Sequence, residues 1–217
     1  MTTVPAKRRR NARGEGDRLR IDLLDAAVDL MAEHGTIEGI TLRAVARRAG
    51  VSATAVYRHF DDHTGLLREA VEHCWRNFNE MLEDAQRAGI DAFDAFERSG
   101  RGYVRFAMEH QGQYRVMFSN RIALQADDDS IAASTFQILV DQTTEMLRAL
   151  GDDRDPIFVA TQVHTWIHGI VDLMGRTPDI PWPAIDDQLT GLQRTLGLVR
   201  PGTVDRLSGS CRETEPP

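Results

Sequence analysis

Two histidines and one aspartate in the C-terminal half of the chain are spaced four residues apart. His164, His168 and Asp172 stand at positions i, i+4 and i+8, which places them on one face of a helix. Two imidazoles and a carboxylate are a set of metal ligands. The first and third residues are about 12 Å apart along a helix that rises ~1.5 Å per residue, so one ion cannot bind all three. We expect packing and hydrogen bonding at a helix interface, and no cofactor; the alternative is a metal held by the two histidines with outside ligands.

Side chains suited to catalysis are not grouped elsewhere in the sequence. A helical enzyme would need a nucleophile paired with a base, or a complete metal site, and the histidine pair is the nearest approach to either. The two cysteines, Cys74 and Cys211, are too few for a disulfide framework and form no metal-binding pair. The sequence therefore predicts a protein of the reducing cytoplasm that is not an enzyme.

Basic side chains, which bind polyanions, are concentrated at the N-terminus. The chain has 217 residues with 26 Lys+Arg and 33 Asp+Glu, a formal charge of -7. Residues 1–20 hold seven basic and two acidic residues, a net +5, and residues 1–63 hold eleven and nine, a net +2, which leaves -9 for residues 64–217. Because a polyanion repels net negative charge unless positive groups gather on one surface, we expect any nucleic-acid contact in the N-terminal part.

The spacing of apolar residues predicts the elements that position these groups, and all of them are helices. Three-and-four spacing, with capping residues, indicates helices at residues 17–35, 42–49, 53–60, 64–89, 91–109, 113–119, 130–150, 156–175 and 184–197. No run reaches the ~18 apolar residues of a membrane helix, and the basic start lacks the apolar core of a signal peptide. The predicted fold class is all-α.

Two of these helices are short and follow one another closely. Thr41 is suited to cap the helix at 42–49, Gly50 to end it with a positive φ, and Ser52 to cap the helix at 53–60. Two short helices joined by a three-residue turn form a helix-turn-helix. Such a unit places the N-terminal residues of its second helix against base edges in the major groove of DNA.

The stretch from Gly39 to Phe60 resembles the DNA-binding domain of the TetR family of transcriptional regulators. The resemblance extends over residues 21–67 and includes the Ala26-Ala27 pair, the Ala-Gly-Val-Ser turn and the Val-Tyr-Arg-His-Phe end of the recognition helix. It implies a homodimer that binds a palindromic operator in double-stranded DNA. It also implies a C-terminal domain that encloses a small-molecule effector.

The residues around the turn are the candidates for contact with DNA. Arg43 is the leading base reader, because a guanidinium pairs bidentately with guanine. Thr54 offers a methyl or hydroxyl group to a base edge, and Tyr57 offers a phenol to base or phosphate. The remaining candidates are expected to hold phosphates or to make an apolar contact: Arg58, Ser52, Thr41, His59 and Ala53. The basic arm is interpreted as a clamp on the DNA backbone or minor groove, with a tail of no function as the alternative.

His63 departs from the pattern of the resembled family. Many relatives have a lysine at this position, at the start of the fourth helix, where it donates to a phosphate. An imidazole donates one hydrogen bond when neutral, and its charge depends on pH near neutrality. We therefore expect no phosphate contact from His63.

The helices at 130–150 and 156–175 are predicted to pair with their mates in the dimer, as the last two long helices do in the resembled family. The second contains Thr165–Met174, which resembles the Trp-x-His-Gly motif of one C-terminal subgroup. Gly169 inside a helix costs about 1 kcal/mol relative to alanine, and close approach of another helix would compensate for it.

Large apolar and amphipathic residues of the middle helices are the candidates for the effector pocket. Together they predict a small, largely apolar effector, oriented by a few hydrogen bonds from tyrosine and histidine side chains. Each of them taken alone fits core packing better than ligand contact. The candidates are Trp75, Phe78, Phe96, Tyr103, Phe106, Tyr114, Met117, Phe118, Phe136, His164 and Trp166.

These observations divide the chain into four segments. They are a disordered basic arm at 1–16, a helix-turn-helix domain at 17–63, an effector-binding and dimerisation domain at 64–200 and a disordered tail at 201–217. The predicted function is sequence-specific regulation of transcription, as a homodimeric repressor that its effector releases from the operator. The alternatives are a helical enzyme, which would protect no DNA sequence, and a structural DNA-binding protein, whose apolar pocket would stay empty in every ligand screen.

Overall fold

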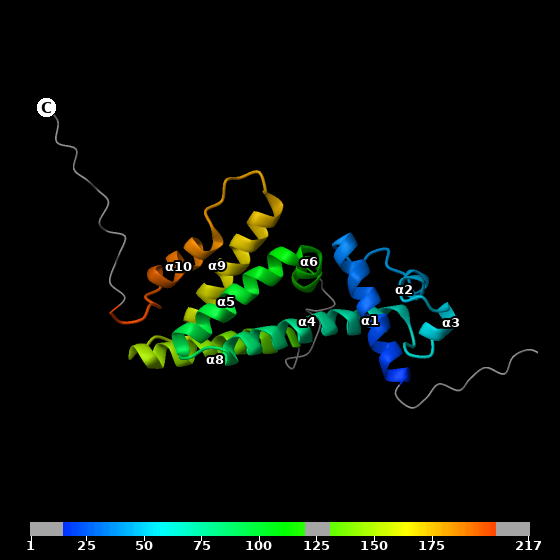
Figure 1. Ribbon diagram of the computed structural model, residues 1–217, viewed down its shortest axis with the longest axis horizontal. Coiled ribbons are helices and arrows are strands. Elements are labelled where there is room, and N and C mark those ends of the chain that lie inside the picture. The colour runs from blue at the N-terminus through cyan, green and yellow to red at the C-terminus, as the bar shows by residue number, and fades with distance from the viewer. Residues whose placement is uncertain (1–14, 120–130, 203–217) are drawn as a thin grey trace, which may run out of the picture. The chain divides into compact units, whose positions relative to one another are not determined.

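The computed structural model describes residues 15–119 and 131–202, and the chain in these ranges is mostly helical (Figure 1). The helices are α1 (Glu15–His34), α2 (Leu42–Arg48), α3 (Ala53–Val56), α4 (His63–Arg87), α5 (Ala92–Glu109), α6 (Gln111–Ser119), α8 (Ile131–Leu150), α9 (Pro156–Arg176) and α10 (Ile185–Thr195). No strand occurs in these ranges, and the prediction of an all-α fold is confirmed. The expected arm and tail lie, but for a few residues, outside the described ranges.

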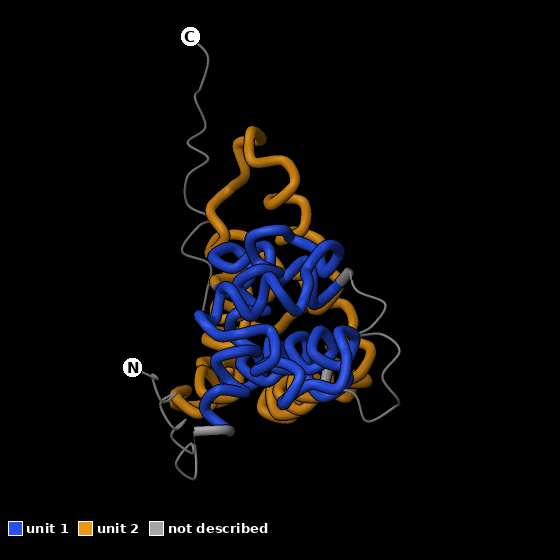
Figure 2. Tube along the Cα trace, turned by 90° about the vertical axis from the view of Figure 1, so that its right-hand side faces the viewer, with its two compact units in different colours: residues 1–80, 106–135 blue, residues 81–105, 136–217 orange. Residues whose placement is uncertain are grey.

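The chain packs as two compact units (Figure 2). Unit 1 comprises residues 1–80 and 106–135, and unit 2 comprises residues 81–105 and 136–217. Unit 1 therefore holds α1, α2, α3, the first part of α4, the last turn of α5, all of α6 and the start of α8. The domain boundary expected after residue 63 stays a prediction. The compact units divide the chain differently, since α6 and much of α4 pack with the helix-turn-helix.

The helix-turn-helix of unit 1 forms the side-chain cap predicted at Thr41 but not the one predicted at Ser52. The Thr41 hydroxyl accepts a hydrogen bond from the Ala44 N–H at 3.1 Å, and Gly50 follows α2 with a φ of +69°. Ser52 stands at the N-cap of α3 but makes no side-chain capping bond. The cap of α2 thus fixes where that helix begins, while the Ser52 hydroxyl is left exposed at the turn.

The α-helical part of the recognition segment is shorter than expected. α3 ends at Val56, and residues 57–59 continue it as a tight turn in which the His59 N–H donates to the Val56 carbonyl at 2.9 Å. Bonds from i to i+3 tighten the last turn of a helix. The recognition segment therefore reaches Phe60, with its second half wound more tightly than an α-helix.

The start of α6 lies against the end of α1 within unit 1. A Cβ atom placed on Gly112 would lie 1.9 Å from the carbonyl oxygen of Ala32. Because no side chain fits there, the two backbones are in direct contact, which only glycine allows. The helix-turn-helix is thereby joined to α6 without an intervening side chain.

In unit 2, α9 begins at a complete cap and buries one stripe. The Asp155 carboxylate accepts a hydrogen bond from the Ile157 N–H at 2.9 Å, and Pro156 occupies the first turn. Val159, Ala160, Val163, Ile167 and Val171 are buried. Beyond α10, Arg200 forms an ion pair with Asp91 at 2.6 Å, so the chain after α10 is fixed to the start of α5.

Candidate nucleic-acid interface and effector site

Packing of the helix-turn-helix forces the predicted DNA-contacting side chains outward. Leu42 and Val45 of α2 and Ala55 and Val56 of α3 are buried in unit 1, as is Phe60 after the turn. Residues between them on each helix therefore face away from the core. The exposed candidates are Thr41, Arg43, Ser52, Thr54, Tyr57 and Arg58, and the half-buried ones are Ala53 and His59.

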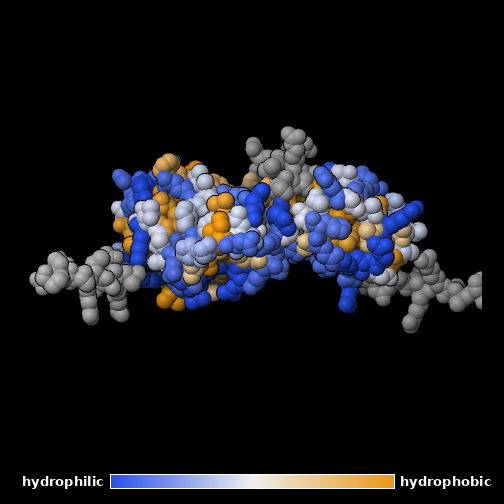
Figure 3. Space-filling model, turned by 90° about the horizontal axis from the view of Figure 1, so that it is seen from above, coloured by the Kyte–Doolittle hydropathy of each residue, from blue (hydrophilic) through white to orange (hydrophobic). Residues whose placement is uncertain are grey.

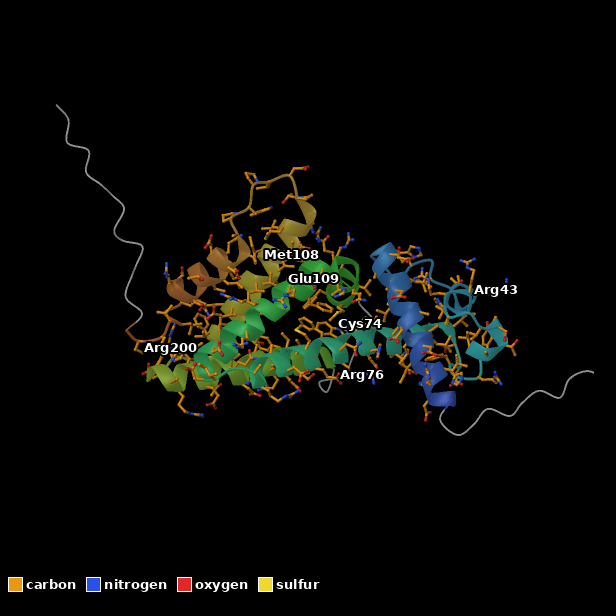
Figure 4. All side chains as sticks on the ribbon, viewed as in Figure 1. Arg43, Cys74, Arg76, Met108, Glu109 and Arg200 are labelled. Carbon is orange, nitrogen blue, oxygen red and sulfur yellow. The ribbon has the colours of Figure 1, made fainter. Side chains whose placement is uncertain are left out.

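The arginines of α2 and α3 fall into two groups. Arg48 donates to Glu33 at 2.5 Å and lies 3.6 Å from Asp29, so it ties α2 to α1. Arg43 and Arg58 make no ion pair or hydrogen bond within the part of the chain that the structure describes, and Figure 4 shows Arg43 on the outer side of α2. Their guanidinium groups are available for an anionic partner.

Tyr57 is the one large aromatic residue that the recognition segment leaves on the surface. Its exposed fraction is 60%. A large apolar ring is usually more buried than this, and a phenol has a polar tip suited to a wet interface. Tyr57 and Thr54 stand three residues apart on the same side of the segment, so both are accessible to one partner.

Arg20 holds the end of the recognition segment in place. It donates hydrogen bonds to the His59 carbonyl oxygen and to the Glu69 carboxylate, and its guanidinium carbon lies 4.5 Å from the centroid of the Phe60 ring. One side chain thus joins α1, the turn after α3 and α4. In the sequence analysis Arg20 is only one of the basic residues of the N-terminus. No spacing pattern in the sequence indicates that it holds the recognition segment.

The side chain of His63 makes a hydrogen bond within the protein. Its Nε2 atom hydrogen-bonds to the Ile40 carbonyl oxygen, which can only accept, so this nitrogen carries the proton. The bond ties the start of α4 to the residue before Thr41. It gives a structural reason for the expectation that His63 makes no phosphate contact.

Aromatic residues of α4, α5 and α6 meet in unit 1, and we call these five the aromatic cluster: Trp75, Phe78, Phe106, Tyr114 and Phe118. The Trp75 ring centroid lies 4.9 Å from that of Phe118 and 6.1 Å from that of Phe78, both edge to face. Phe78 lies 4.8 Å from Phe106, and Tyr114 lies 4.5 Å from Phe118. The structure therefore brings half of the predicted pocket residues together, with Met117 buried in the same unit.

The other pocket candidates belong to unit 2. Phe96 and Tyr103 are buried, whereas Phe136, His164 and Trp166 are half-buried. The rings of Phe136 and His164 meet edge to face with their centroids 5.9 Å apart. The candidates thus form a set in each unit.

His164 and His168 stack on one another along α9. Their ring centroids are 5.8 Å apart with an interplanar angle of 14°. Burial lowers the pKa of His164, helped by the neighbouring His168, and burial lowers the pKa of His168 against the opposing charge of Asp172. Asp172 itself pairs with Arg176 at 2.8 Å. Residues 15–119 and 131–202 contain no group of three or more His, Cys, Asp or Glu side chains able to hold a metal ion.

One face of α9 carries apolar residues that residues 15–119 and 131–202 leave exposed. Phe158 and Leu173 are 59% and 50% exposed, and a Cβ atom on Gly169 would meet nothing within 4 Å. These three residues share a face, since they are separated by eleven and four positions. The close helix approach expected at Gly169 is therefore not made by any of the described residues. Hydrophobic residues lie among hydrophilic ones on the surface shown in Figure 3.

Family models match both parts of the chain. Residues 23–70 match the model of bacterial regulatory proteins of the tetR family, and residues 96–182 match that of the tetracyclin repressor-like C-terminal domain. The chain belongs to the TetR family, whose members are transcriptional regulators with an N-terminal helix-turn-helix. The resemblance to the Trp-x-His-Gly subgroup stays a prediction.

Individual relatives agree with this family. An HTH-type transcriptional repressor of Mycobacterium tuberculosis is 30% identical over 122 residues, which is 55% of this chain and 64% of that protein, so the match spans less than two thirds of the relative. A solved protein of unknown function from Rhodococcus sp. RHA1 is 27% identical, with a TM-score of 0.68, over 82% of this chain and 93% of its own. The repressor of the Stenotrophomonas maltophilia multidrug efflux pump SmeDEF is 26% identical, with a TM-score of 0.59, over 86% and 95%.

No helix within residues 15–119 and 131–202 combines the length and the apolar character that crossing a membrane requires.

Proposed function

We propose that the protein is a homodimeric repressor that binds a palindromic operator in double-stranded DNA and is released by a small, largely apolar effector. It works in the cytoplasm and catalyses no reaction. The observation that carries the proposal is the exposed set Arg43, Thr54 and Tyr57, held outward by a buried helix-turn-helix core. Side chains of these types read base edges when a recognition helix enters the major groove.

The dimer is supported by the uncovered face of α9. A helix-turn-helix touches few base pairs, so such regulators need two copies to reach useful affinity. Gly169 leaves room for a helix to approach closely, and the exposed side chains of Phe158 and Leu173 lie on the same face. A second copy of α9 would bury these apolar groups and offset the cost of a glycine within a helix.

The effector is supported by the aromatic rings that the middle helices bring together. Effector sites in proteins are mostly apolar and aromatic, with a few polar groups that fix orientation. The similar protein of known structure from Stenotrophomonas maltophilia is the repressor of a multidrug efflux pump. For this chain we propose that the effector occupies the region of the aromatic cluster.

Footprinting on the DNA that flanks the coding region tests the proposal. We expect a protected palindrome whose half-sites lie about one helical turn, or a multiple of it, apart. The variant Arg43→Ala should lose this protection. Arg148→Ala is the matched control, because Arg148 lies in unit 2 and, among the described residues, forms an ion pair only with Glu145 of its own helix. If the wild-type protein protects no sequence, the proposed function is wrong.

A further inference from the structure

The indole nitrogen of Trp75 is buried without a hydrogen-bond partner. Within the described ranges, Trp75 Nε1 is the one buried side-chain nitrogen or oxygen in this condition, and the residue is 5% exposed. An indole N–H can only donate, so it needs an acceptor. Leaving such a donor buried and unpaired destabilises the fold, and each case in a native protein calls for an explanation.

Elsewhere in the described ranges, buried and half-buried polar side chains have hydrogen-bond partners. The Trp182 Nε1–H donates to the Thr177 carbonyl oxygen at 3.0 Å. Asn79 lies one turn after Trp75 on α4, and its side-chain amide donates to the Ser134 hydroxyl at 2.9 Å. The Trp75 indole therefore lacks a hydrogen-bond acceptor, although the amide of Asn79, one turn further along the same helix, has a partner.

The indole of Trp75 is buried against aromatic rings. Rings of Phe78 and Phe118 stand edge to face against the indole. The neighbouring Cys74 thiol is buried, and this burial raises its pKa to about 12. The indole is buried against these two rings, and moving a carboxylate or a phosphate out of water into contact with it would be costly.

We propose that the aromatic cluster binds a neutral, largely apolar molecule whose carbonyl or ether oxygen accepts a hydrogen bond from Trp75 Nε1–H. The rings supply the apolar contact, and the indole supplies the single directional bond. The sequence led us to expect this bond from tyrosine and histidine side chains. The description of the bound molecule as the effector rests on the proposed function, whereas the binding itself does not.

Nuclear magnetic resonance on the full-length protein, labelled with nitrogen-15, tests the proposal at the atom concerned. The chain has three tryptophans and so three indole N–H signals, and Trp75→Phe identifies the one from Trp75. The probes are two matched pairs, acetophenone with ethylbenzene and 2-acetylnaphthalene with 2-ethylnaphthalene. Within each pair a ketone replaces a methylene group of similar size, so only the acceptor differs.

We expect at least one ketone to move the Trp75 signal downfield, toward the position of the hydrogen-bonded Trp182 signal. Its hydrocarbon should move it less and in no consistent direction. The signals of Trp166 and Trp182 should stay in place. A Trp75 signal that neither ketone moves, or that already lies at the hydrogen-bonded position because of a trapped water, would overturn the proposal.

Calorimetry gives the matching affinities. The ketone should bind about tenfold more tightly than its hydrocarbon, as a hydrogen bond to a buried donor allows. Trp75→Phe keeps an aromatic ring but removes the donor, so this preference should disappear. Trp166→Phe is the control, because Trp166 lies in unit 2, and it should keep the preference. Equal preference in both variants would show that another group of the protein donates the hydrogen bond to the ketone.

Release of operator DNA separates this proposal from the proposed function. A ketone that shifts the Trp75 signal but leaves the DNA complex intact supports the site and contradicts its role as an effector site. A molecule that releases DNA without moving the Trp75 signal supports the repressor and overturns the role of Trp75.

Discussion

The guanidinium of Arg20 hydrogen-bonds to the carboxylate of Glu69 and links the first helix of unit 1 to α4. The same guanidinium holds the His59 carbonyl oxygen and lies over Phe60, at the end of the recognition segment. The orientation of that segment therefore depends on a residue outside the helix-turn-helix.

We predict that Arg20→Ala weakens operator binding more than it weakens the fold. The ion pair is about a third exposed on each side, so its loss should cost less than about 1 kcal/mol in urea unfolding. The recognition segment, however, loses the bond that fixes its last turn, and gel-shift affinity should fall. Arg87→Ala, which removes an exposed pair within α4, is the control and should change neither quantity.

We predict that Arg43→Ala relaxes discrimination at one base pair of the operator. A bidentate contact to guanine is worth about 1 to 3 kcal/mol of discrimination against the wrong base. Competition with operators substituted at single positions measures this, and unfolding should be unchanged because Arg43 has no partner within the described residues. Equal weakening on every sequence would instead indicate a phosphate contact.

We predict that Gly112→Ala destabilises the protein by about 1 to 3 kcal/mol, the range typical of overpacking. The new Cβ atom would lie 1.9 Å from the Ala32 carbonyl oxygen, so α6 and α1 must separate. Gly100→Ala is the matched control, since its Cβ atom on α5 meets nothing within 4 Å. That substitution should stabilise the fold by up to about 1 kcal/mol through helix propensity. Thermal unfolding of both variants measures the two changes in stability, and a Gly112→Ala protein as stable as the wild type would contradict the prediction.

We predict that Gly169→Leu yields a folded monomer. The chain itself has room for the side chain, but a second helix could no longer approach closely. Gly191→Leu on α10 also enters open space and should leave the dimer intact. Sedimentation measures the oligomeric state, and circular dichroism checks the helices. A dimeric Gly169→Leu protein would place the interface on another surface.

We predict that protonation of His164 contributes a loss of stability in acid. Burial lowers its pKa in the folded protein below the ordinary 6.5. Above pH 6.5 the imidazole is neutral in both states, so it adds no slope; below that value the unfolded chain takes up the proton more readily, and stability falls until the folded pKa is passed. Urea unfolding between pH 5 and pH 8 should show a smaller slope for His164→Gln than for the wild type. His34→Gln, at an exposed histidine, is the control.

Local chemistry made the helix-turn-helix predictable. Thr41 caps α2 and Gly50 ends it as the sequence indicates, because capping and positive φ depend on residues next to one another in the chain. Leu42, Val45 and Val56 are buried, and because they lie on short helices their burial determines which side chains face outward. The early end of α3 was not predictable, since spacing does not distinguish an α-helical turn from a tighter one.

Long-range contacts could not be predicted in the same way. The contacts of Arg20 join residues separated by 39 and 49 positions, and no pattern in the sequence marks such pairs. The unpaired donor of Trp75 is equally invisible, because an absent partner can be recognised only when all neighbours are known. Likewise Gly112 looks like an ordinary glycine near the start of a helix until Ala32 is placed beside it.

The direct backbone contact between Gly112 and Ala32 bears on how a signal travels through unit 1. A side chain between two helices can change its rotamer when one helix shifts slightly, so the other helix need not move. Two backbones in direct contact cannot adjust in this way. A displacement of α6 of a few tenths of an ångström must therefore reappear in α1, from which Arg20 holds the recognition segment. The transmission from the aromatic cluster to the DNA-facing side chains would then work as a rigid linkage, within one packed body.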